Sequence, residues 1–187
     1  MYLIKFLIIY TVIILKRKSV QLLNTYKVYR KWGLLLTKDQ IIRNTKNITI
    51  GSKFGMGYNC QLFAQGDPGN AEIIIGNNVA MNFNVMINAD CGGKIIIDDH
   101  VRIGPYTVMR ASNHKFDDIN SPIYTQGHEP GKIVIEEDVW LGAHVTILKN
   151  VRIGRSSVIG AGSVVTSDIP PFSIAAGVPA KVIMNRK

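Results

Sequence analysis

The chain has 187 residues, of which 47% are hydrophobic and 19% charged, with 17 glycines and 7 prolines. That length suits one domain of ordinary size plus a short extension, and the composition excludes a disordered chain, a collagen and a polytopic membrane protein. The net charge of +9 belongs to residues 1–46, which hold ten Lys or Arg and one Asp, whereas residues 47–187 hold twelve basic and twelve acidic residues. Because the larger part is neutral, a nucleic acid is not an expected partner.

An apolar extension comes first in the chain. Residues 2–15 are almost wholly apolar, broken by Lys5, and Lys16-Arg17-Lys18 follows. As a helix these 14 residues span about 21 Å, short of the ~30 Å hydrocarbon core of a bilayer. Residues 19–36 then place Leu, Tyr and Trp among further Lys and Arg, a pattern typical of a helix lying on an anionic membrane surface. A helix that packs on the body or on a neighbouring subunit is the alternative. The first interpretation predicts a cytoplasmic protein attached peripherally to the inner face of the membrane.

A six-residue repeat dominates the rest of the chain. From Ile135 onward a branched or long apolar residue recurs at every sixth position, and a small or β-branched residue stands four positions after each of the first five. Three earlier stretches follow the same rule. The fifteen apolar positions are Ile50, Met56, Leu62, Ile75, Met81, Ile87, Ile97, Ile103, Met109, Ile135, Leu141, Ile147, Ile153, Ile159 and Val165. The spacing breaks between 62 and 75, between 87 and 97, and between 109 and 135, so loops are expected there.

A period of six fits neither an α-helix nor the simple alternation of a two-faced strand, and a β-sandwich would not keep the phase through six hexads. It fits short strands joined by turns that rotate the chain by a third of a circle, so that three hexads form a coil of about 18 residues. Residues that tolerate positive φ are expected at the turns, namely Gly51, Gly57, Gly76, Asn77, Asn82 and Asn88. The sequence therefore predicts an all-β fold, a parallel β-helix over 47–187, with a helical extension over 1–46 and one long inserted loop at 110–132.

Residues 133–183 contain the segments VWLG, GAGSVVTSDIPP and AGVPAKVI, and residues 82–90 are NFNVMINAD. In these segments the chain resembles the hexapeptide-repeat O-acetyltransferases of the left-handed β-helix type. The subgroup is that of the galactoside and maltose acetyltransferases and of the enzymes that acetylate capsular polysaccharide, O-antigen and colanic acid. The resemblance covers most of residues 50–183. It implies a left-handed coil, a homotrimer with active sites between subunits, and transfer of acetyl from acetyl-CoA to a sugar hydroxyl by direct attack in a ternary complex. The basic apolar extension favours a role in surface polysaccharide biosynthesis, because an enzyme at a membrane surface would meet a lipid-linked or growing glycan.

Such a transfer needs a base that takes the hydroxyl proton, a hydrogen-bond donor that stabilises the oxyanion of the intermediate, and a groove that holds the pantetheine arm. It needs no metal. Histidine suits the role of base because its unperturbed pKa of about 6.5 leaves it largely neutral at physiological pH. His114 lies in a polar stretch at the start of the longest interruption, and it matches the place where the family carries its catalytic histidine. His128, in the same interruption, is a secondary candidate. His100 and His144 occupy turn positions and are expected to be exposed.

The resemblance also implies the binding residues. Asn82 and Asp90 match positions that hydrogen-bond the acceptor sugar, although a turn-forming Asn and a loop Asp would look the same in sequence. Trp140 precedes a core position and is expected to point outward, toward the cofactor groove or a subunit contact. The other cofactor positions are Gly142, Ala143, Gly160 and Ala161 along pantetheine, and Thr166, Ser167 and Lys181 at the nucleotide end. The family often has Lys and Arg where this chain has Ser167 and Met184, so weaker nucleotide binding is expected unless Lys181, Arg186 or Lys187 compensates.

Other functions remain alternatives. An N-acyltransferase of an amino or nucleotide sugar stays open, because the fold does not determine the acceptor. A metal hydratase of the γ-carbonic anhydrase type needs closely spaced histidines, and a scaffold of the ice-binding type needs a flat row of Thr; neither pattern is present in the sequence. Cys60 occupies a small-residue core position and Cys91 an interruption, with no base at a useful spacing, so a cysteine nucleophile is not expected. Without a CxxC pair, a reducing compartment is the expectation.

Overall fold

The computed structural model describes residues 2–37, 39–65 and 71–187, and within the N-terminal helix it describes the side chains of residues 15, 16 and 19–32. The chain divides into two compact units, Met1–Asp39 and Gln40–Lys187.

The first unit contains the helix α1, Tyr2–Trp32, which confirms the helix predicted for the extension. The helix ends at Gly33, whose φ of 69° suits a residue without a side chain and whose N–H donates to the Tyr29 carbonyl at 2.8 Å. The side chains of the predicted apolar run at 2–14, and those of Arg17 and Lys18, lie outside the described residues. In the part of the chain that the structure describes, no helix is long and apolar enough to cross a bilayer.

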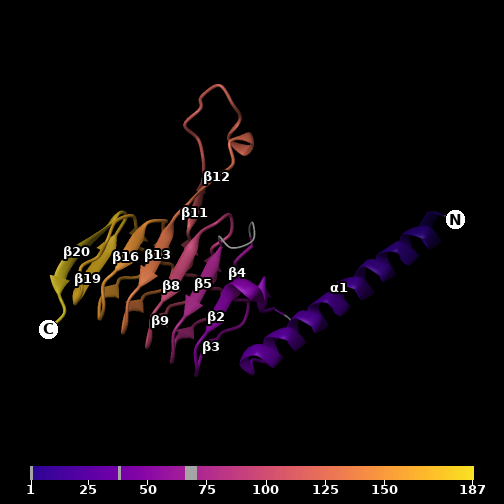
Figure 1. Ribbon diagram of the computed structural model, residues 1–187, viewed down its shortest axis with the longest axis horizontal. Coiled ribbons are helices and arrows are strands. Elements are labelled where there is room, and N and C mark those ends of the chain that lie inside the picture. The colour runs from indigo at the N-terminus through magenta and orange to yellow at the C-terminus, as the bar shows by residue number, and fades with distance from the viewer. Residues whose placement is uncertain (1, 38, 66–70) are drawn as a thin grey trace. The chain divides into compact units, whose positions relative to one another are not determined.

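The second unit is a three-sided parallel β-solenoid, which confirms the predicted β-helix (Figure 1). Each side is a sheet, named here by its first strand. The β1 sheet contains β1 (Ile41–Arg43), β4 (Gln61–Phe63), β7 (Met86–Asn88), β10 (Val108–Arg110), β15 (Thr146–Ile147) and β18 (Val164–Val165). The β2 sheet contains β2 (Ile48–Ile50), β5 (Glu72–Ile75), β8 (Lys94–Ile97), β13 (Lys132–Ile135) and β16 (Val151–Ile153).

The β3 sheet forms the third side and closes the C-terminal end. It contains β3 (Gly55–Met56), β6 (Ala80–Met81), β9 (Arg102–Ile103), β14 (Trp140–Leu141), β17 (Val158–Ile159) and β19 (Ser173–Gly177), with β20 (Ala180–Asn185) antiparallel to β19. At the other end, β1 pairs with β4 and so belongs to the solenoid, whereas the sequence pattern placed residues 41–46 in the extension. β1 precedes the first recognisable hexad, and η1 (Thr45–Asn47) separates it from β2.

The strand register has the predicted period. Ile135 pairs with Ile153, Leu141 with Ile159 and Ile147 with Val165, so in each pair the partner lies 18 residues further along the chain. Three hexads therefore complete one coil, and equivalent side chains stack on one another.

The core is the column of large aliphatic residues inside the prism. Of the fifteen predicted apolar positions, fourteen are buried and Met56 is half-buried. The small residues predicted beside them are buried as well, namely Val139, Val145, Val151, Ser157 and Ser163. Burying one Ile or Leu stabilises the fold by ~1.5–3 kcal/mol, so the stack supplies the main stabilisation of the unit.

The prediction about the turns is wrong, since none of the six named Gly and Asn residues has a positive φ. The left-handed residues come later in each turn, for example Lys53 and Asn78. Glycine occurs at these turn positions for a different reason. A Cβ on Gly51 would lie 2.7 Å from the carbonyl carbon of Gly76 in the next coil. The coils approach too closely at these positions to leave space for a side chain.

Gly104→Ala tests this explanation of the glycines. A Cβ at position 104 would lie 2.5 Å from the carbonyl carbon and oxygen of Gly142 in the next coil. The coils must then shift, and we expect the free energy of unfolding to fall by ~1–3 kcal/mol in urea denaturation followed by circular dichroism. Gly55→Ala is the matched control, because its Cβ would have no neighbour closer than 3.8 Å. An equal loss of stability in both variants would contradict the explanation.

All three breaks in the repeat lie at one edge of the prism, where the chain passes from the β1 sheet to the β2 sheet. The first break includes residues 66–70, which lie outside the described residues. The third carries a two-stranded hairpin, β11 (Ser112–His114) and β12 (His128–Pro130), whose loop contains η2 (Ile123–Thr125). Figure 1 shows this hairpin standing out from the solenoid. We call this edge the hairpin edge.

Candidate active site

The hairpin is fastened to the solenoid at its root. The Gly131 N–H donates to the Ala111 carbonyl at 2.7 Å, and the Ala111 N–H donates to the Asn88 carbonyl of the adjacent coil at 3.0 Å. Gly93 leaves space for this contact, because a Cβ there would lie 2.8 Å from the Ala111 Cβ. The stem of the hairpin is therefore held by backbone bonds to the coil next to it.

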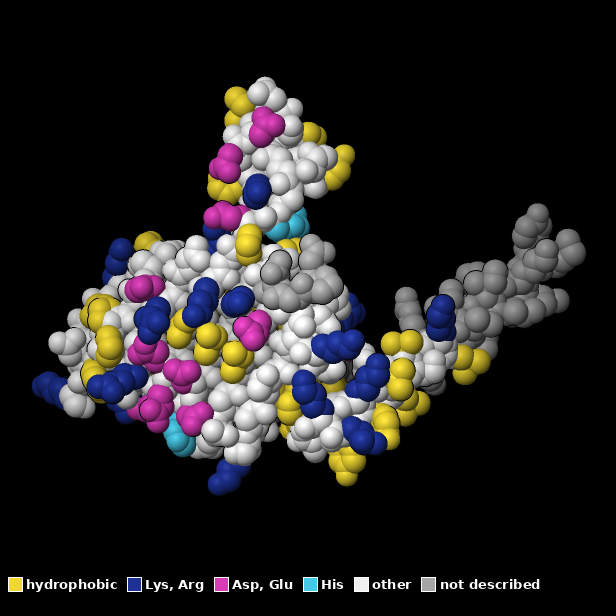
Figure 2. Space-filling view, in the orientation of Figure 1, with side chains coloured by type: hydrophobic (Ala, Val, Ile, Leu, Met, Phe, Trp, Pro, Cys, Tyr) yellow, Lys and Arg dark blue, Asp and Glu magenta, His cyan; other side chains and the backbone are white. Residues whose placement is uncertain are grey.

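The two strands of the hairpin bring two histidines together. His114 lies directly opposite His128, and their ring centroids are 4.1 Å apart with a tilt of 40°. His114 is exposed and His128 is half-buried. Figure 2 shows histidine side chains at the base of the projecting hairpin. The pKa of His128 lies below its ordinary value, first because burial disfavours the charged ring and then because of His114 and Arg110. His128 thus presents a neutral ring to His114 at physiological pH.

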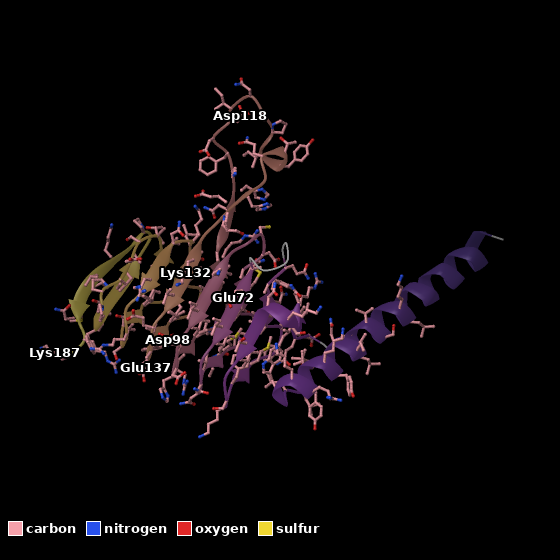
Figure 3. The ribbon with its side chains drawn as sticks, in the orientation of Figure 1. Glu72, Asp98, Asp118, Lys132, Glu137 and Lys187 are labelled. Carbon is pink, nitrogen blue, oxygen red and sulfur yellow. The ribbon has the colours of Figure 1, made fainter. Side chains whose placement is uncertain are left out.

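The loop beyond the stem is held by its own hydrogen bonds. Asp118, near the tip in Figure 3, accepts from the Ser121 hydroxyl at 2.6 Å and from the Asn120 N–H at 2.9 Å, and these bonds hold the pKa of its carboxyl below the usual range. On the stem, Glu129 forms an ion pair with Lys149 of the following coil at 2.8 Å. Of these contacts, the ion pair of Glu129 with Lys149 links the stem to the body.

Asp90 lies at the hairpin edge, in the turn that stacks next to the hairpin root. Its carboxylate accepts from the Gln65 N–H, and its own N–H donates to the Asn88 side-chain oxygen at 2.9 Å. Asp90 is thus brought to the same edge as His114, and one of its carboxylate oxygens is already engaged in holding the turn.

Asn82 lies at a different edge, where the chain passes from the β3 sheet to the β1 sheet. Its side-chain oxygen accepts from the Phe83 N–H at 2.8 Å, which is a turn-forming bond. Rings stack along this edge, which we call the aromatic edge: Tyr58 on Phe83 at 5.2 Å, Phe83 against Tyr106 at 5.5 Å, and Tyr106 on His144 at 4.6 Å. The aromatic column accounts for His144, which is exposed as predicted.

The predicted pantetheine positions also lie at or beside the aromatic edge. Trp140 in β14 is 57% exposed, so its indole points outward as expected. Gly142 and Ala143 follow β14, and Gly160 and Ala161 follow β17, so the four residues stack at this edge. A Cβ on Gly142 would lie 2.7 Å from the Ala161 nitrogen, so the packing of the coils alone requires a glycine there.

The three residues predicted to bind the nucleotide end of coenzyme A do not lie together within one chain. Thr166 and Ser167 follow β18 at the hairpin edge, whereas Lys181 lies in β20 at the C-terminal end, and all three are exposed. Arg186, a residue that could supply a missing cation, already forms an ion pair with Asp138 at 2.9 Å.

Within one chain, therefore, the predicted site residues other than Trp140 and Lys181 divide between two edges of the prism, both bordering the β1 sheet. His114, Asp90, Thr166 and Ser167 lie at the hairpin edge; Asn82, Gly142, Ala143, Gly160 and Ala161 lie at the aromatic edge. The sequence did not show that His128 faces His114, because that pairing depends on the strand register of the hairpin. Cys60 is a core thiol as predicted, with its pKa raised by burial.

Known proteins are similar to this chain in sequence. The family model for the bacterial transferase hexapeptide (six repeats) matches residues 132–167. The chain is 41% identical over 118 residues to the galactoside O-acetyltransferase of Escherichia coli (strain K12), an alignment covering 60% of this chain and 54% of that protein. The matched part thus spans about half the length of this curated relative.

Two solved structures are similar over most of the unit. One is a hexapeptide-repeat acetyltransferase from Vibrio cholerae O1 biovar eltor in complex with acetyl coenzyme A, with a TM-score of 0.63 and 32% identity, covering 76% of this chain and 74% of that one. The other is a mutant of AntD, an N-acyltransferase from Bacillus cereus in complex with dTDP and coenzyme A, with a TM-score of 0.69 and 25% identity, covering 82% and 81%.

The fold and the hairpin site define a class: three-sided parallel solenoids of six-residue repeats with a histidine-bearing insertion at one edge. With these likenesses, the chain belongs to the hexapeptide-repeat acetyltransferase family.

Proposed function

We propose that this protein is a cytoplasmic acetyltransferase that moves acetyl from acetyl-CoA to a sugar hydroxyl in the synthesis of a surface polysaccharide. The observation that carries the proposal is the placement of His114 on a fixed hairpin stem, exposed and packed against the ring of His128. An exposed imidazole on a rigid support can accept a proton from a bound alcohol, which is the difficult part of this transfer. The relative in E. coli and the acetyl-CoA complex from V. cholerae support the choice of donor and acceptor.

In the proposed reaction the ring of His114 takes the proton from the sugar hydroxyl as its oxygen attacks the thioester carbonyl. The carbon–oxygen bond forms, and the carbonyl oxygen becomes an oxyanion that backbone N–H groups of the site stabilise. The intermediate collapses by breaking the carbon–sulfur bond, and the thiol of coenzyme A leaves with the proton from His114. The products are the acetyl ester and free coenzyme A, so atoms and charges balance without a covalent enzyme intermediate.

The division of the site residues between two edges supports a site shared by neighbouring subunits. The hairpin edge of one protomer would supply His114 and Asp90, and the aromatic edge of the next would supply Asn82, Trp140 and the small residues of the pantetheine track. A homotrimer, the assembly that the resemblance implies, would bring the two edges of neighbouring protomers together. Light scattering of the purified protein tests this assembly.

His128 acts in this proposal as a positioning residue. It faces His114 across the hairpin stem, and its neutral ring limits the rotamers of the base without competing for a charge. It needs no contact with the substrate to do so.

Thiol release from acetyl-CoA tests the function directly, with a panel of simple sugars, nucleotide sugars and membrane glycolipid extract as acceptors. We expect release that depends on a hydroxyl acceptor and yields an alkali-labile ester. The similarity to AntD favours one alternative, an N-acyltransferase of an amino sugar carried on a nucleotide. Release only with amine acceptors would replace the first proposal by this alternative.

Ser167→Lys tests the weak nucleotide end of the proposed cofactor track. Ser167 is exposed, and the Asp168 carboxylate beside it already accepts from the Arg152 N–H at 2.7 Å, so an added cation at 167 is available to the phosphates of coenzyme A. We expect the KM for acetyl-CoA to fall about fivefold with kcat unchanged, in line with one partly exposed charge-assisted contact. Lys53 in a distant turn supplies a control, since Lys53→Ser should leave the KM unchanged. An unaltered KM in Ser167→Lys would remove Ser167 from the track.

A further inference from the structure

The helix α1 carries an exposed apolar face that nothing in the proposed reaction uses. Leu15, Leu22, Tyr26 and Tyr29 follow one another at intervals of seven, four and three residues, so they lie along one side of the helix. Their side chains are exposed by 61%, 70%, 56% and 51%. Several exposed leucines and tyrosines on one side of a helix are unfavourable in water and mark a surface that binds something.

Cations border this apolar face on one side. Lys16, Lys27 and Arg30 lie on the adjoining sector of the helix and are exposed. The Arg30 guanidinium donates to the Tyr26 hydroxyl at 3.4 Å, which places the charge at the rim of the apolar face. The sequence has no Asp or Glu before Asp39, so no acidic side chain in the helix offsets these charges.

We propose that this face of α1 binds the surface of a bilayer that contains anionic lipid. The leucines and tyrosines would enter the interface while Lys16, Lys27 and Arg30 meet the phosphate headgroups. A nucleic acid would satisfy the cations and leave the leucines in water. A second copy of the same helix would cover the leucines and bring like charges together. An anionic lipid interface satisfies both groups at once. Binding here would deliver the solenoid to lipid-linked glycans, and it stands independently of the acetyl transfer.

Flotation of the full-length protein with vesicles tests the proposal. Vesicles of equal parts phosphatidylcholine and phosphatidylglycerol are compared with vesicles of phosphatidylcholine alone, at low and at high salt. We expect binding to the anionic vesicles at low salt and weaker binding in the other conditions, because salt screens the headgroup charges. Lys27→Gln with Arg30→Gln should weaken binding roughly 25-fold, about fivefold for each cation. Leu22→Gln, Tyr26→Gln and Tyr29→Gln together should abolish it at every salt concentration.

Matched variants on the second unit serve as controls. Lys94→Gln with Lys132→Gln removes two exposed cations from the β2 sheet, and Ile119→Gln, Ile123→Gln and Tyr124→Gln remove three exposed apolar side chains from the hairpin loop. Neither should change vesicle binding. Wild-type protein that stays unbound at low salt, or a helix variant that binds as well as its control, overturns the proposal. If the triple helix variant instead changes the oligomeric state without vesicles, the face is a subunit contact and the proposal fails. Thiol release should persist in both helix variants, so failure here is distinguishable from failure of the proposed function.

Discussion

His114→Ala should lower kcat for acetyl transfer by two to four orders of magnitude, with the solenoid intact. The reason is that the variant removes the only ring that is both exposed and fixed on the hairpin stem, and general base catalysis contributes about 10²–10⁴-fold. The measurement is steady-state thiol release with the best acceptor of the panel. The KM for acetyl-CoA should stay within about twofold, because His114 is not among the residues proposed to hold the cofactor.

His100→Asn is the control for the loss of a histidine. His100 has a φ of 64° in a turn between the β2 and β3 sheets and bonds to the Asn78 side chain at 2.8 Å, away from both proposed edges. Asparagine tolerates that backbone conformation, so this variant should keep full activity. His114→Asn, with the same change at the proposed base, should be as inactive as His114→Ala. A loss below tenfold in the His114 variants would remove His114 from the mechanism.

His128→Ala is expected to lower kcat ten- to hundredfold and to leave the KM for each substrate unchanged. Without the facing ring at 4.1 Å, His114 can adopt other rotamers, and a base misplaced by about 1 Å can lose a factor of about 100. The split between kcat and KM is the diagnostic readout, because a general loosening of the fold would raise KM and lower the unfolding temperature as well.

His128→Phe provides the conservative variant. Phenylalanine keeps a planar ring opposite His114 and cannot carry a proton, so it should restore most of the activity lost in His128→Ala. If both variants were equally inactive, the imidazole of His128 would have a chemical role, and packing alone would not explain it. If both were fully active, His128 would have no part in positioning the base.

The solenoid could be predicted from sequence because one residue in each group of six is enough to reveal the repeat. Each hexad needs one large aliphatic residue inside the prism, so Leu141 and Ile147 mark the coil without any long-range information. The positive-φ positions could not be placed in the same way. The pattern shows where glycine occurs, but Gly51 is required by the proximity of Gly76 in the next coil, a contact 25 residues away in sequence.

The candidate site could be predicted only in part for a related reason. His114 was a candidate because it lies near the start of the longest break in the repeat and matches the place where the family carries its catalytic histidine. Its partner His128 depends on the register of an antiparallel hairpin, and polar loop residues do not encode a register. Likewise, the sequence did not show that Asn82 and Asp90 lie at different edges. That conclusion requires knowing which strands belong to which sheet of the prism.

The concentration of all three breaks at the hairpin edge has a consequence for how such a chain can change. A segment that leaves and re-enters at a corner adds length without shifting the phase of any later hexad, so the stacked aliphatic layers are undisturbed. The other two corners of the prism are closed by short turns. Insertions at the hairpin edge can therefore alter the surroundings of His114, while the proposed pantetheine track at the aromatic edge keeps its dimensions.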